Sequence, residues 1–231
     1  MESDPALGLW RQVLELGPAL CGPPEVSGQA ETLLISRMIR LVPEIEIWQT
    51  DTDQSLYHNQ WLLEFIRDGQ TTQLKKLTYS GEVLQVAPDI VAGAAMKVET
   101  LIARLSSLQV DAILASLAAT QDSKLRDLVV CWNPVNFSTL DPEVMAGALV
   151  KLERVDFDLS NCLSTDQVTA LFCRICNSPD LRLTELLLLN KDISLVPPEV
   201  LVLAIQRLKR VHLVFGWMTD EQATAILTLV K

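Results

Sequence analysis

Apolar residues recur along this chain at the first, fourth and sixth positions of a short segment. Leu152, Val155 and Phe157 give the clearest example, with charged residues between them. Because side chains alternate between the two faces of a strand, the fourth and sixth residues point to the same side. Each segment therefore predicts a short strand with one buried face. The other segments with this spacing are Val42/Ile45/Ile47, Leu74/Leu77/Tyr79, Leu125/Leu128/Val130, Leu183/Leu186/Leu188 and Leu208/Val211/Leu213, with Val98/Leu101/Ala103 as a weaker version.

A helical pattern follows each predicted strand, and two kinds of helix start alternate. One kind has proline followed by an acidic residue, as in Pro142-Glu143, which suits a first turn where no N–H partner is needed and negative charge is favoured. Pro88-Asp89 and Pro198-Glu199 repeat it. The other kind is a polar segment ending in glutamine, Ser164 to Gln167 and Thr219 to Gln222, which can cap a helix. A repeated strand–helix unit predicts a solenoid. We therefore expect seven strands, beginning near residues 42, 74, 98, 125, 152, 183 and 208, in one parallel sheet.

The phased L-x-x-L-x-L spacing resembles the ribonuclease-inhibitor-like class of leucine-rich repeats, which includes the repeat arrays of intracellular NOD-like receptors. The resemblance covers residues 42 to 231. It implies an α/β horseshoe with parallel strands on the concave face and helices on the convex face. Members of the class generally bind other proteins and lack catalysis. The chain departs from the class at position nine, where Asn133 matches the expected asparagine but Ser160, Lys191 and Gly216 do not. It also shows no nucleotide-binding module, so a receptor role does not follow.

We interpret residues 41–231 as the leucine-rich-repeat solenoid and residues 1–40 as a helical N-terminal cap. Asp4-Pro5 suits a helix start, and Glu25 to Arg40 carries a second helical pattern. Because Pro23-Pro24-Glu25-Val26 echoes the later proline helices, a degenerate repeat is a second interpretation of this cap.

Composition and charge narrow the possible partners. Apolar residues make up 49% of the 231 residues and charged residues 21%, which is enough material for a core. The net charge of −10 opposes binding to nucleic-acid phosphates, so no nucleic-acid partner is expected. No segment approaches the roughly 18 apolar residues of a membrane-spanning helix, and the acidic start from Met1 to Asp4 is not a signal peptide. The five cysteines then indicate reduced thiols in a cytoplasmic protein.

The sequence offers little for catalysis. His58 and His212 are too few histidines for a nucleophile–base arrangement, and no phosphate-binding glycine motif occurs. Asp156 and Asp158 share one strand face and could do acid–base work or hold a metal. Without a closed pocket, an acidic patch that meets solvent or a partner is the better interpretation. We expect no cofactor and no metal.

Cys173 and Cys176 have the spacing of a redox pair or of two zinc ligands. A redox pair sits where a strand enters a helix N-terminus, which lowers one thiol pKa, whereas this pair lies well inside a helix predicted to start near Ser164. Zinc would need two further ligands, and Cys162 alone is not enough. We therefore predict that both cysteines are buried, act as small apolar residues and are unreactive in the native protein.

The outward face of the strands is the most informative surface. It should be polar if it met only water, as it is at Thr78 and Ser80, yet other units place apolar residues there. Contiguous exposed apolar surface usually marks an interaction site. The alternative is that parallel strands are apolar on both faces. The candidate partner-binding residues on this face are Trp48, Ile102, Val129, Cys131, Trp132, Asp156, Asp158, Leu187, Leu189, His212, Val214 and Phe215.

These patterns predict a non-catalytic intracellular protein–protein interaction module, an adaptor or regulatory subunit that binds a protein through its concave face. Two alternatives are a substrate-recognition subunit of a ubiquitin ligase, which an F-box-like N-terminus would support, and an enzyme with a site on the concave face. Self-association through the C-terminal edge is a further expectation. The last helical pattern there carries Ile226, Leu227, Leu229 and Val230, and a solenoid needs a polar cap.

Overall fold

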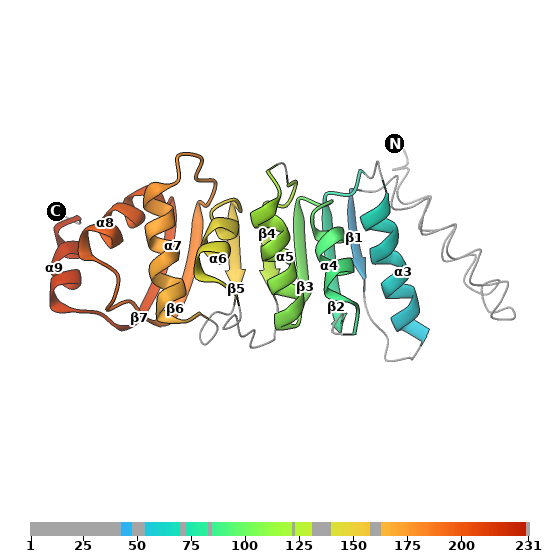
Figure 1. Cartoon of the computed structure of the whole chain (residues 1–231), viewed down its shortest axis with the longest axis horizontal. Coiled ribbons are helices and arrows are strands. Elements are labelled where there is room, and N and C mark those ends of the chain that lie inside the picture. Colours follow the sequence, from blue (N-terminus) through green and yellow to red (C-terminus); the bar gives the residue numbers. More distant parts are fainter. Residues whose placement is uncertain are drawn as a thin grey trace, which may run out of the picture.

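The computed structural model describes residues 43–47, 54–69, 73–82, 85–121, 123–130, 140–157 and 163–229 of the chain. Strands and helices alternate along these residues (Figure 1). The strands are β1 Glu44–Ile47, β2 Lys76–Glu82, β3 Thr100–Arg104, β4 Asp127–Val130, β5 Arg154–Phe157, β6 Glu185–Asp192 and β7 Arg210–Trp217. The helices are α3 Gln54–Asp68, α4 Pro88–Ala95, α5 Ser107–Ala119, α6 Pro142–Leu149, α7 Thr165–Asn177, α8 Pro198–Arg207 and α9 Asp220–Leu229. The predicted cap at residues 1–40 lies outside the described residues.

The seven strands form one sheet in the order β1 to β7, and every neighbouring pair is parallel. This confirms the single parallel sheet that the repeated motif predicts. Each strand begins two residues after the first residue of its motif, for instance at Arg154 after Leu152. The weaker unit at residue 98 keeps the same register, because Leu101 lies between Leu77 and Leu128.

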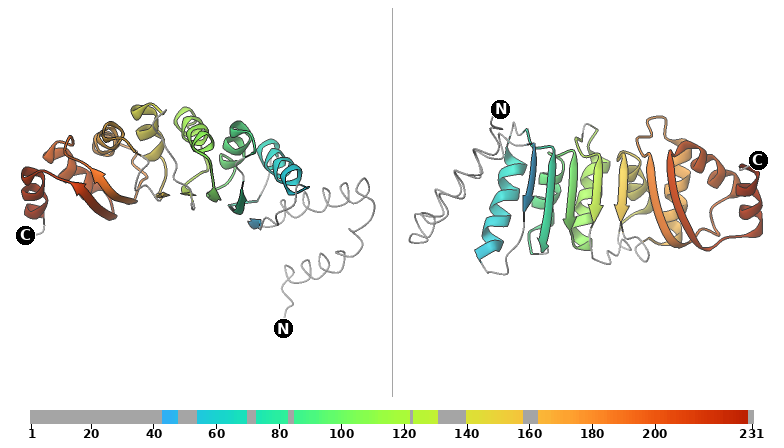
Figure 2. Two further views of the ribbon diagram at one scale, coloured as in Figure 1. Left: turned by 90° about the horizontal axis from the view of Figure 1, so that it is seen from below. Right: turned by 180° about the vertical axis from the view of Figure 1, so that it is seen from behind.

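The described helices all lie on one face of the sheet (Figure 2). The row of units bends, so that the helices are on the outer side of the arc and the strands on the inner side. Parallel strands need a crossover connection, and among the described residues each crossover contains one helix. The outward face of the strands is therefore concave. Among the described residues, no helix combines the length and the apolar character needed to cross a membrane.

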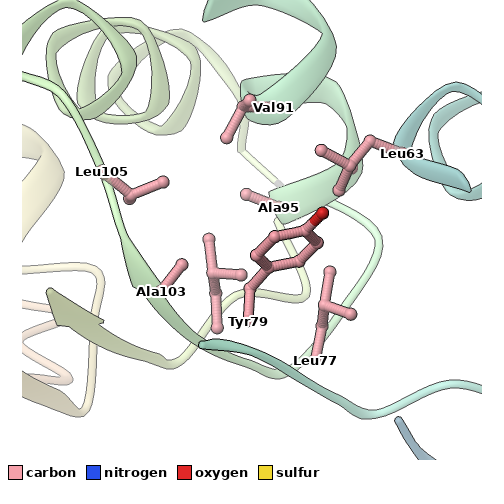
Figure 3. Close-up of a pocket in the computed structure, with 9 residues that line it drawn as sticks. Leu63, Leu77, Tyr79, Val91, Ala95, Ala103 and Leu105 are labelled. Atoms are coloured by element: carbon pink, nitrogen blue, oxygen red, sulfur yellow. The ribbon is translucent and has the colours of Figure 1, made fainter. Parts of the chain in front are cut away.

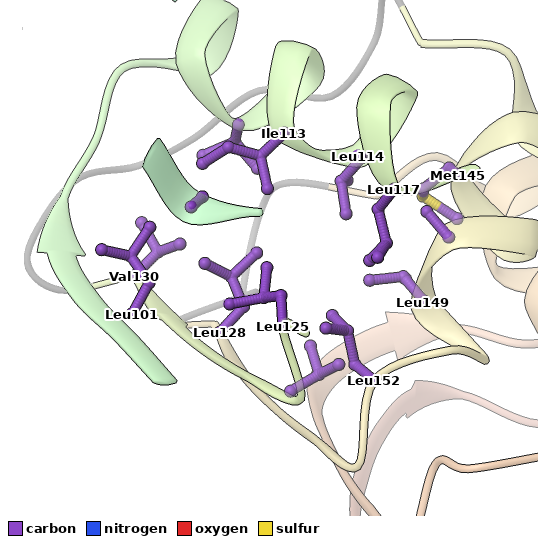
Figure 4. Packing of buried hydrophobic residues seen from close by; sticks show 14 of the residues in the cluster. Leu101, Ile113, Leu114, Leu117, Leu125, Leu128, Val130, Met145, Leu149 and Leu152 are labelled. Atoms are coloured by element: carbon purple, nitrogen blue, oxygen red, sulfur yellow. The ribbon is translucent and has the colours of Figure 1, made fainter. Parts of the chain in front are cut away.

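The core lies between the sheet and the helices and is built from the motif positions. In Figure 4, Leu114 and Leu117 of α5 lie beside Met145 and Leu149 of α6, above leucines from the strands. Full burial of one leucine stabilises the fold by about 1.5–3 kcal/mol. Because each unit contacts only the units next to it, much of this stabilisation comes from its neighbours. The buried motif residues are Leu74, Leu77, Tyr79, Val98, Leu101, Ala103, Leu125, Leu128, Val130, Leu152, Val155, Leu183, Leu186 and Leu208.

The proline–acid pairs start helices, as predicted. Helices α4, α6 and α8 begin at Pro88, Pro142 and Pro198. Asp141 caps α6, because its carboxylate accepts hydrogen bonds from the backbone N–H groups of Glu143 (2.9 Å) and Val144 (3.1 Å). Helices α4 and α8 have no side-chain cap, so the proline and the acidic first turn are what all three share.

The polar segments that end in glutamine also start helices, in the reciprocal arrangement called a capping box. In α7, the Ser164 hydroxyl accepts from the N–H of Gln167 at 3.2 Å, and the Gln167 carboxamide oxygen accepts from the N–H of Ser164 at 2.9 Å. Thr219 and Gln222 repeat this geometry at the start of α9. Helix α5 has a third box, Ser106 with Gln109, which the sequence interpretation did not include.

The same glutamines link neighbouring units. In each case the side-chain amide donates to the carbonyl two residues before a helix-initial proline. The bonds are Gln109 to Val86 (2.8 Å), Gln167 to Leu140 (3.0 Å) and Gln222 to Val196 (2.6 Å). The three glutamines are 0%, 1% and 1% exposed, and buried polar groups are costly unless paired. These glutamines therefore fix the starts of α5, α7 and α9 against the loop of the unit before each helix.

Basic side chains link the opposite ends of the helices. The Lys151 ammonium, which follows α6, donates to the carbonyls of Leu117 and Thr120 at the end of α5, both at 2.9 Å. Arg207, the last residue of α8, donates to the Ile175 carbonyl in α7 at 2.7 Å. The last carbonyls of a helix lack intrahelical partners and favour a nearby cation. The units of α6 and α8 therefore each complete the helix that precedes them.

Candidate interaction surface

A charged row crosses the concave face where the strands begin. Its members are consecutive register partners: Glu44, Lys76, Thr100, Asp127, Arg154, Glu185 and Arg210. Acidic and basic residues alternate from Asp127 to Arg210, and Glu44 and Lys76 form a separate opposite-charge pair on the other side of the uncharged Thr100. Lys76 pairs with Glu44 at 3.4 Å, Thr100 donates to Asp127 at 3.0 Å, and Arg210 pairs with Glu185 at 3.2 Å.

The charged row favours the observed register of the strands and contributes little to stability. The side chains of Arg210 and Glu44 are 70% and 66% exposed, and exposed ion pairs contribute only about 0–1 kcal/mol each. Like charges directly opposite each other on neighbouring strands are unfavourable. The alternation therefore favours these neighbours over other pairings. Most charges of this row are therefore paired with a neighbour in the same row.

A second row lies two residues further along the strands and carries three of the predicted partner-binding residues. Thr78, Ile102, Val129 and Asp156 are consecutive register partners on β2 to β5. All four side chains are half-buried. Ile102 and Val129 are side by side and make an apolar centre in this row. The Asp156 carboxylate accepts a hydrogen bond from Arg154 at 2.9 Å, so the acidic side of the row has a basic neighbour.

The other predicted partner-binding residues are placed only in part. In the sheet, Leu187 lies beside His212, and Leu189 lies beside Val214. Phe215 lies beside Lys191, beyond an irregularity in the register of β6 and β7. For these residues the structure describes the strands and not the side chains. Trp48, Cys131, Trp132 and Asp158 lie outside the described residues.

The two cysteines lie inside α7, as predicted, but they are half-buried and not fully buried. They fall beside the fully buried Phe172 and Ile175, at the border of the helix face that meets the core. The Cys176 thiol donates to the Val200 carbonyl at 3.1 Å, and burial raises its pKa. Neither forms a disulfide. Within the described part of the chain, no three His, Cys, Asp or Glu side chains gather closely enough to hold a metal ion.

Two cavities among the described residues lie away from the concave surface. One, of about 10 Å³, is lined by apolar side chains around Tyr79, whose hydroxyl points toward Leu63 and Ala95 (Figure 3). Tyr79 faces the small Ala103 on the next strand, and burial raises the pKa of its hydroxyl. The other is a polar cleft of about 580 Å³ at the ends of α5 and α7, with Lys151 in its wall.

Sequence reasoning missed two features of the structure. The charged row depends on register between residues far apart in sequence, such as Glu44 and Lys76, so local spacing does not show it. The Ser106–Gln109 box did have a local signal, since its Ser-x-x-Gln spacing equals that of Ser164–Gln167.

No protein-family model, curated protein or solved structure matches the chain. The concave surface is a curved sheet with an apolar pair at its centre and paired charges at one rim.

Proposed function

We propose that this chain is a leucine-rich-repeat solenoid of horseshoe form that acts as a non-catalytic protein-interaction module. In this proposal it is a cytoplasmic adaptor or regulatory subunit and holds a protein partner against its concave strand face. The phased motif, the parallel sheet and the helices on the outer side of the arc support the horseshoe assignment.

The neighbouring pair Ile102 and Val129 carries the functional proposal. These side chains are half-buried on a face that no described helix covers. They have a threonine on one side and the Arg154–Asp156 pair on the other. An apolar centre with a polar surround is the usual composition of a protein–protein interface. Because the glutamine and lysine bonds hold neighbouring units together, a partner would meet a preformed surface, which lowers the entropic cost of binding.

The test compares two variants that add charge on opposite sides of the arc. The double variant Ile102→Asp/Val129→Asp places carboxylates on the concave face. The matched control, Leu108→Asp, changes a residue of α5 on the helix side that is 67% exposed. Wild type and both variants are used to capture partners from cytosol, and quantitative mass spectrometry compares the bound proteins. We expect a partner that the control retains and that the double variant loses by at least about tenfold, because burying unpaired charge in an interface is costly.

Circular dichroism and the urea midpoint show whether the variants are folded. If the double variant unfolds, Thr78→Arg provides the same test, because it adds bulk and charge to the same row without a charge on the apolar pair. A partner that all the concave-face variants and the control bind equally well would overturn the proposal.

A further inference from the structure

A basic residue occupies the same repeat position in five consecutive units. It is the residue just before the first apolar residue of the strand motif, so it lies between the end of a helix and the start of the next strand. We call these residues the rim row: Lys97, Lys124, Lys151, Arg182 and Arg207. Because β3 to β7 are consecutive and parallel in one sheet, the rim row follows one rim of the arc.

Acidic residues gather at the opposite rim, where the helices begin. Negative charge is favoured at helix starts and positive charge at helix ends. The acids in the first turns of α4, α6, α7, α8 and α9 are Asp89, Glu143, Asp166, Glu199, Asp220 and Glu221. Even the eight-residue helix α6 is about 12 Å long, which exceeds the screening length of about 8 Å at physiological ionic strength. The rim row can therefore attract an anion although the whole chain has a net charge of −10.

The polar cleft at the ends of α5 and α7 lies at the centre of the rim row. Lys151 and Arg182 are in its wall, and so are Ser123 and Leu125, the two chain neighbours of Lys124. Three successive members of the row therefore meet at this cleft. Its volume of about 580 Å³ is within the range of about 300–1,000 Å³ that is usual for ligand sites.

The three cations at the cleft differ in how far their charges are already satisfied. The Lys151 ammonium donates to the carbonyls of Leu117, Ala118 and Thr120 at 2.8–2.9 Å. Lys124 and Arg182 are exposed, and within the described residues their side chains have no hydrogen bond or ion pair. Burial and the nearby guanidinium groups of Arg174 and Arg182 lower the pKa of Lys151. An anion in the cleft would offset this repulsion between cations.

The other groups of the cleft favour a peptide over a compact inorganic anion. Asp180 is in the cleft wall, so a doubly charged phosphate would meet a carboxylate there. A peptide can place an N–H group against that carboxylate and its own carboxylate against Arg182. Leu117, Leu125 and Leu181 in the same wall provide apolar contact for the rest of a peptide.

The spacing of the rim row also suits an extended peptide. Neighbouring strands are about 4.8 Å apart and packed helices about 8–10 Å apart, so the backbone positions of the row recur every 5–10 Å or so. Alternate residues of an extended chain are about 6.6–6.8 Å apart. Carboxylates on every second residue can therefore meet successive cations of the row.

We propose that the rim row, with the cleft at its centre, binds an extended acidic segment of a protein partner. Carboxylates of the segment pair with Lys124 and Arg182, and a peptide N–H donates to Asp180. This surface is separate from the pair Ile102 and Val129 on the concave face, so either proposal can fail without the other.

The test measures binding of a capped, fluorescent peptide of alternating glutamate and alanine to the full chain. Fluorescence anisotropy is recorded at an ionic strength of about 0.15 M, where nonspecific long-range attraction is largely screened. A peptide with glutamine in place of glutamate is the ligand control. We expect the glutamate peptide to bind and the glutamine peptide not to bind, because only carboxylates form charge-assisted hydrogen bonds with Lys124 and Arg182.

Two double variants with the same net charge decide where the peptide binds. Lys124→Gln/Arg182→Gln removes two cations at the cleft, and the matched control Lys76→Gln/Arg210→Gln removes two from the charged row on the concave face. We expect the first to weaken binding by at least about tenfold and the control to change it by less than about twofold. Circular dichroism and the urea midpoint should show both variants folded, because the altered side chains lie at the surface.

Nuclear magnetic resonance locates the site in the wild-type chain without any substitution. Titration with the glutamate peptide should shift the backbone amide signals of residues 123–125 and 180–183. The amide signals of Ile102 and Val129 should stay in place.

Three outcomes overturn the proposal. The first is no binding of the glutamate peptide to the wild-type chain at concentrations up to about 1 mM. The second is an equal loss of binding in the two double variants, which would show a general effect of charge. The third is an inorganic polyphosphate of equal charge that binds the rim row at least about tenfold more tightly than the peptide, which would make a phosphate polymer the ligand.

Discussion

Gln167 donates a hydrogen bond from its side-chain amide to the backbone carbonyl of Leu140, 3.0 Å away, across the boundary between two units. Leu140 precedes Asp141, the N-cap of α6, so its carbonyl accepts no bond from that helix. The same glutamine completes the capping box of α7 with Ser164. One side chain therefore satisfies one backbone group in its own unit and one in the unit before it.

Replacing this glutamine should destabilise the whole array. Gln167→Ala leaves the Leu140 carbonyl and the Ser164 N–H without these partners in a site that is 1% exposed. We expect the free energy of unfolding to fall by about 1–3 kcal/mol, measured by urea denaturation. The control is Gln206→Ala on the exposed side of α8, which should change stability by less than about 0.5 kcal/mol. Equal effects at the two sites would contradict the role given to Gln167.

Tyr79 should tolerate the loss of its hydroxyl. The residue is 2% exposed, and its hydroxyl oxygen has no hydrogen-bond partner among the described residues. An unpaired buried hydroxyl is costly, so Tyr79→Phe should leave the free energy of unfolding unchanged or raise it by up to about 1 kcal/mol at pH 7. Tyr79→Ala, the control, removes the ring and should cost about 3–5 kcal/mol. A loss of more than about 1 kcal/mol in the phenylalanine variant would mean that the hydroxyl has a partner.

Wild type and Tyr79→Phe should respond differently in stability when the pH is raised. Burial raises the pKa of Tyr79 in the native state, so the unfolded chain loses this proton first as the pH rises. Native stability is therefore unaffected by this group below the ordinary tyrosine pKa of about 10, and it declines above that pH because only the unfolded chain releases the proton there. Urea midpoints at pH 7 and at about pH 10.5 should diverge, with wild type losing more stability than Tyr79→Phe. Identical losses would contradict the burial of this group.

Cys176 should react slowly in the native protein. Burial raises the pKa of its thiol, and the thiolate is the reactive form. Labelling with a thiol reagent near neutral pH should therefore be slower than in urea, and its rate should still be rising above the ordinary thiol pKa of about 8.5. A variant in which the other four cysteines, Cys21, Cys131, Cys162 and Cys173, are replaced by serine isolates this thiol. Native labelling as fast as unfolded labelling would show that the contact with Val200 does not protect the thiol.

The strands and the kinds of helix start could be predicted because they depend on local spacing. Leu128 and Val130 point into the core because a strand alternates, and Pro142 starts a helix because its geometry suits the first turn. The pairing of Ile102 with Val129 followed from placing their strands next to each other.

Features that need a partner from another unit could not be predicted in this way. The carbonyl that Gln109 binds lies at Val86, and nothing near Gln109 in the sequence indicates it. The thiol of Cys176 contacts the Val200 carbonyl of α8, and this contact depends on where that helix packs against α7. The charged row appears only once the register of the sheet is known.

Leu114 and Leu227 offer the sharpest comparison between an inner unit and the last one. They occupy the same position in α5 and α9, yet their exposures are 0% and 66%. Leu114→Ala should lower the free energy of unfolding by about 2.7–5 kcal/mol, because it removes buried methyl groups and leaves a cavity. Leu227→Ala should change it by less than about 0.5 kcal/mol, because the side chain is largely in water already. Urea denaturation of the two variants measures both. If Leu227→Ala is as costly as Leu114→Ala, the Leu227 side chain is buried in solution, which would contradict its 66% exposure.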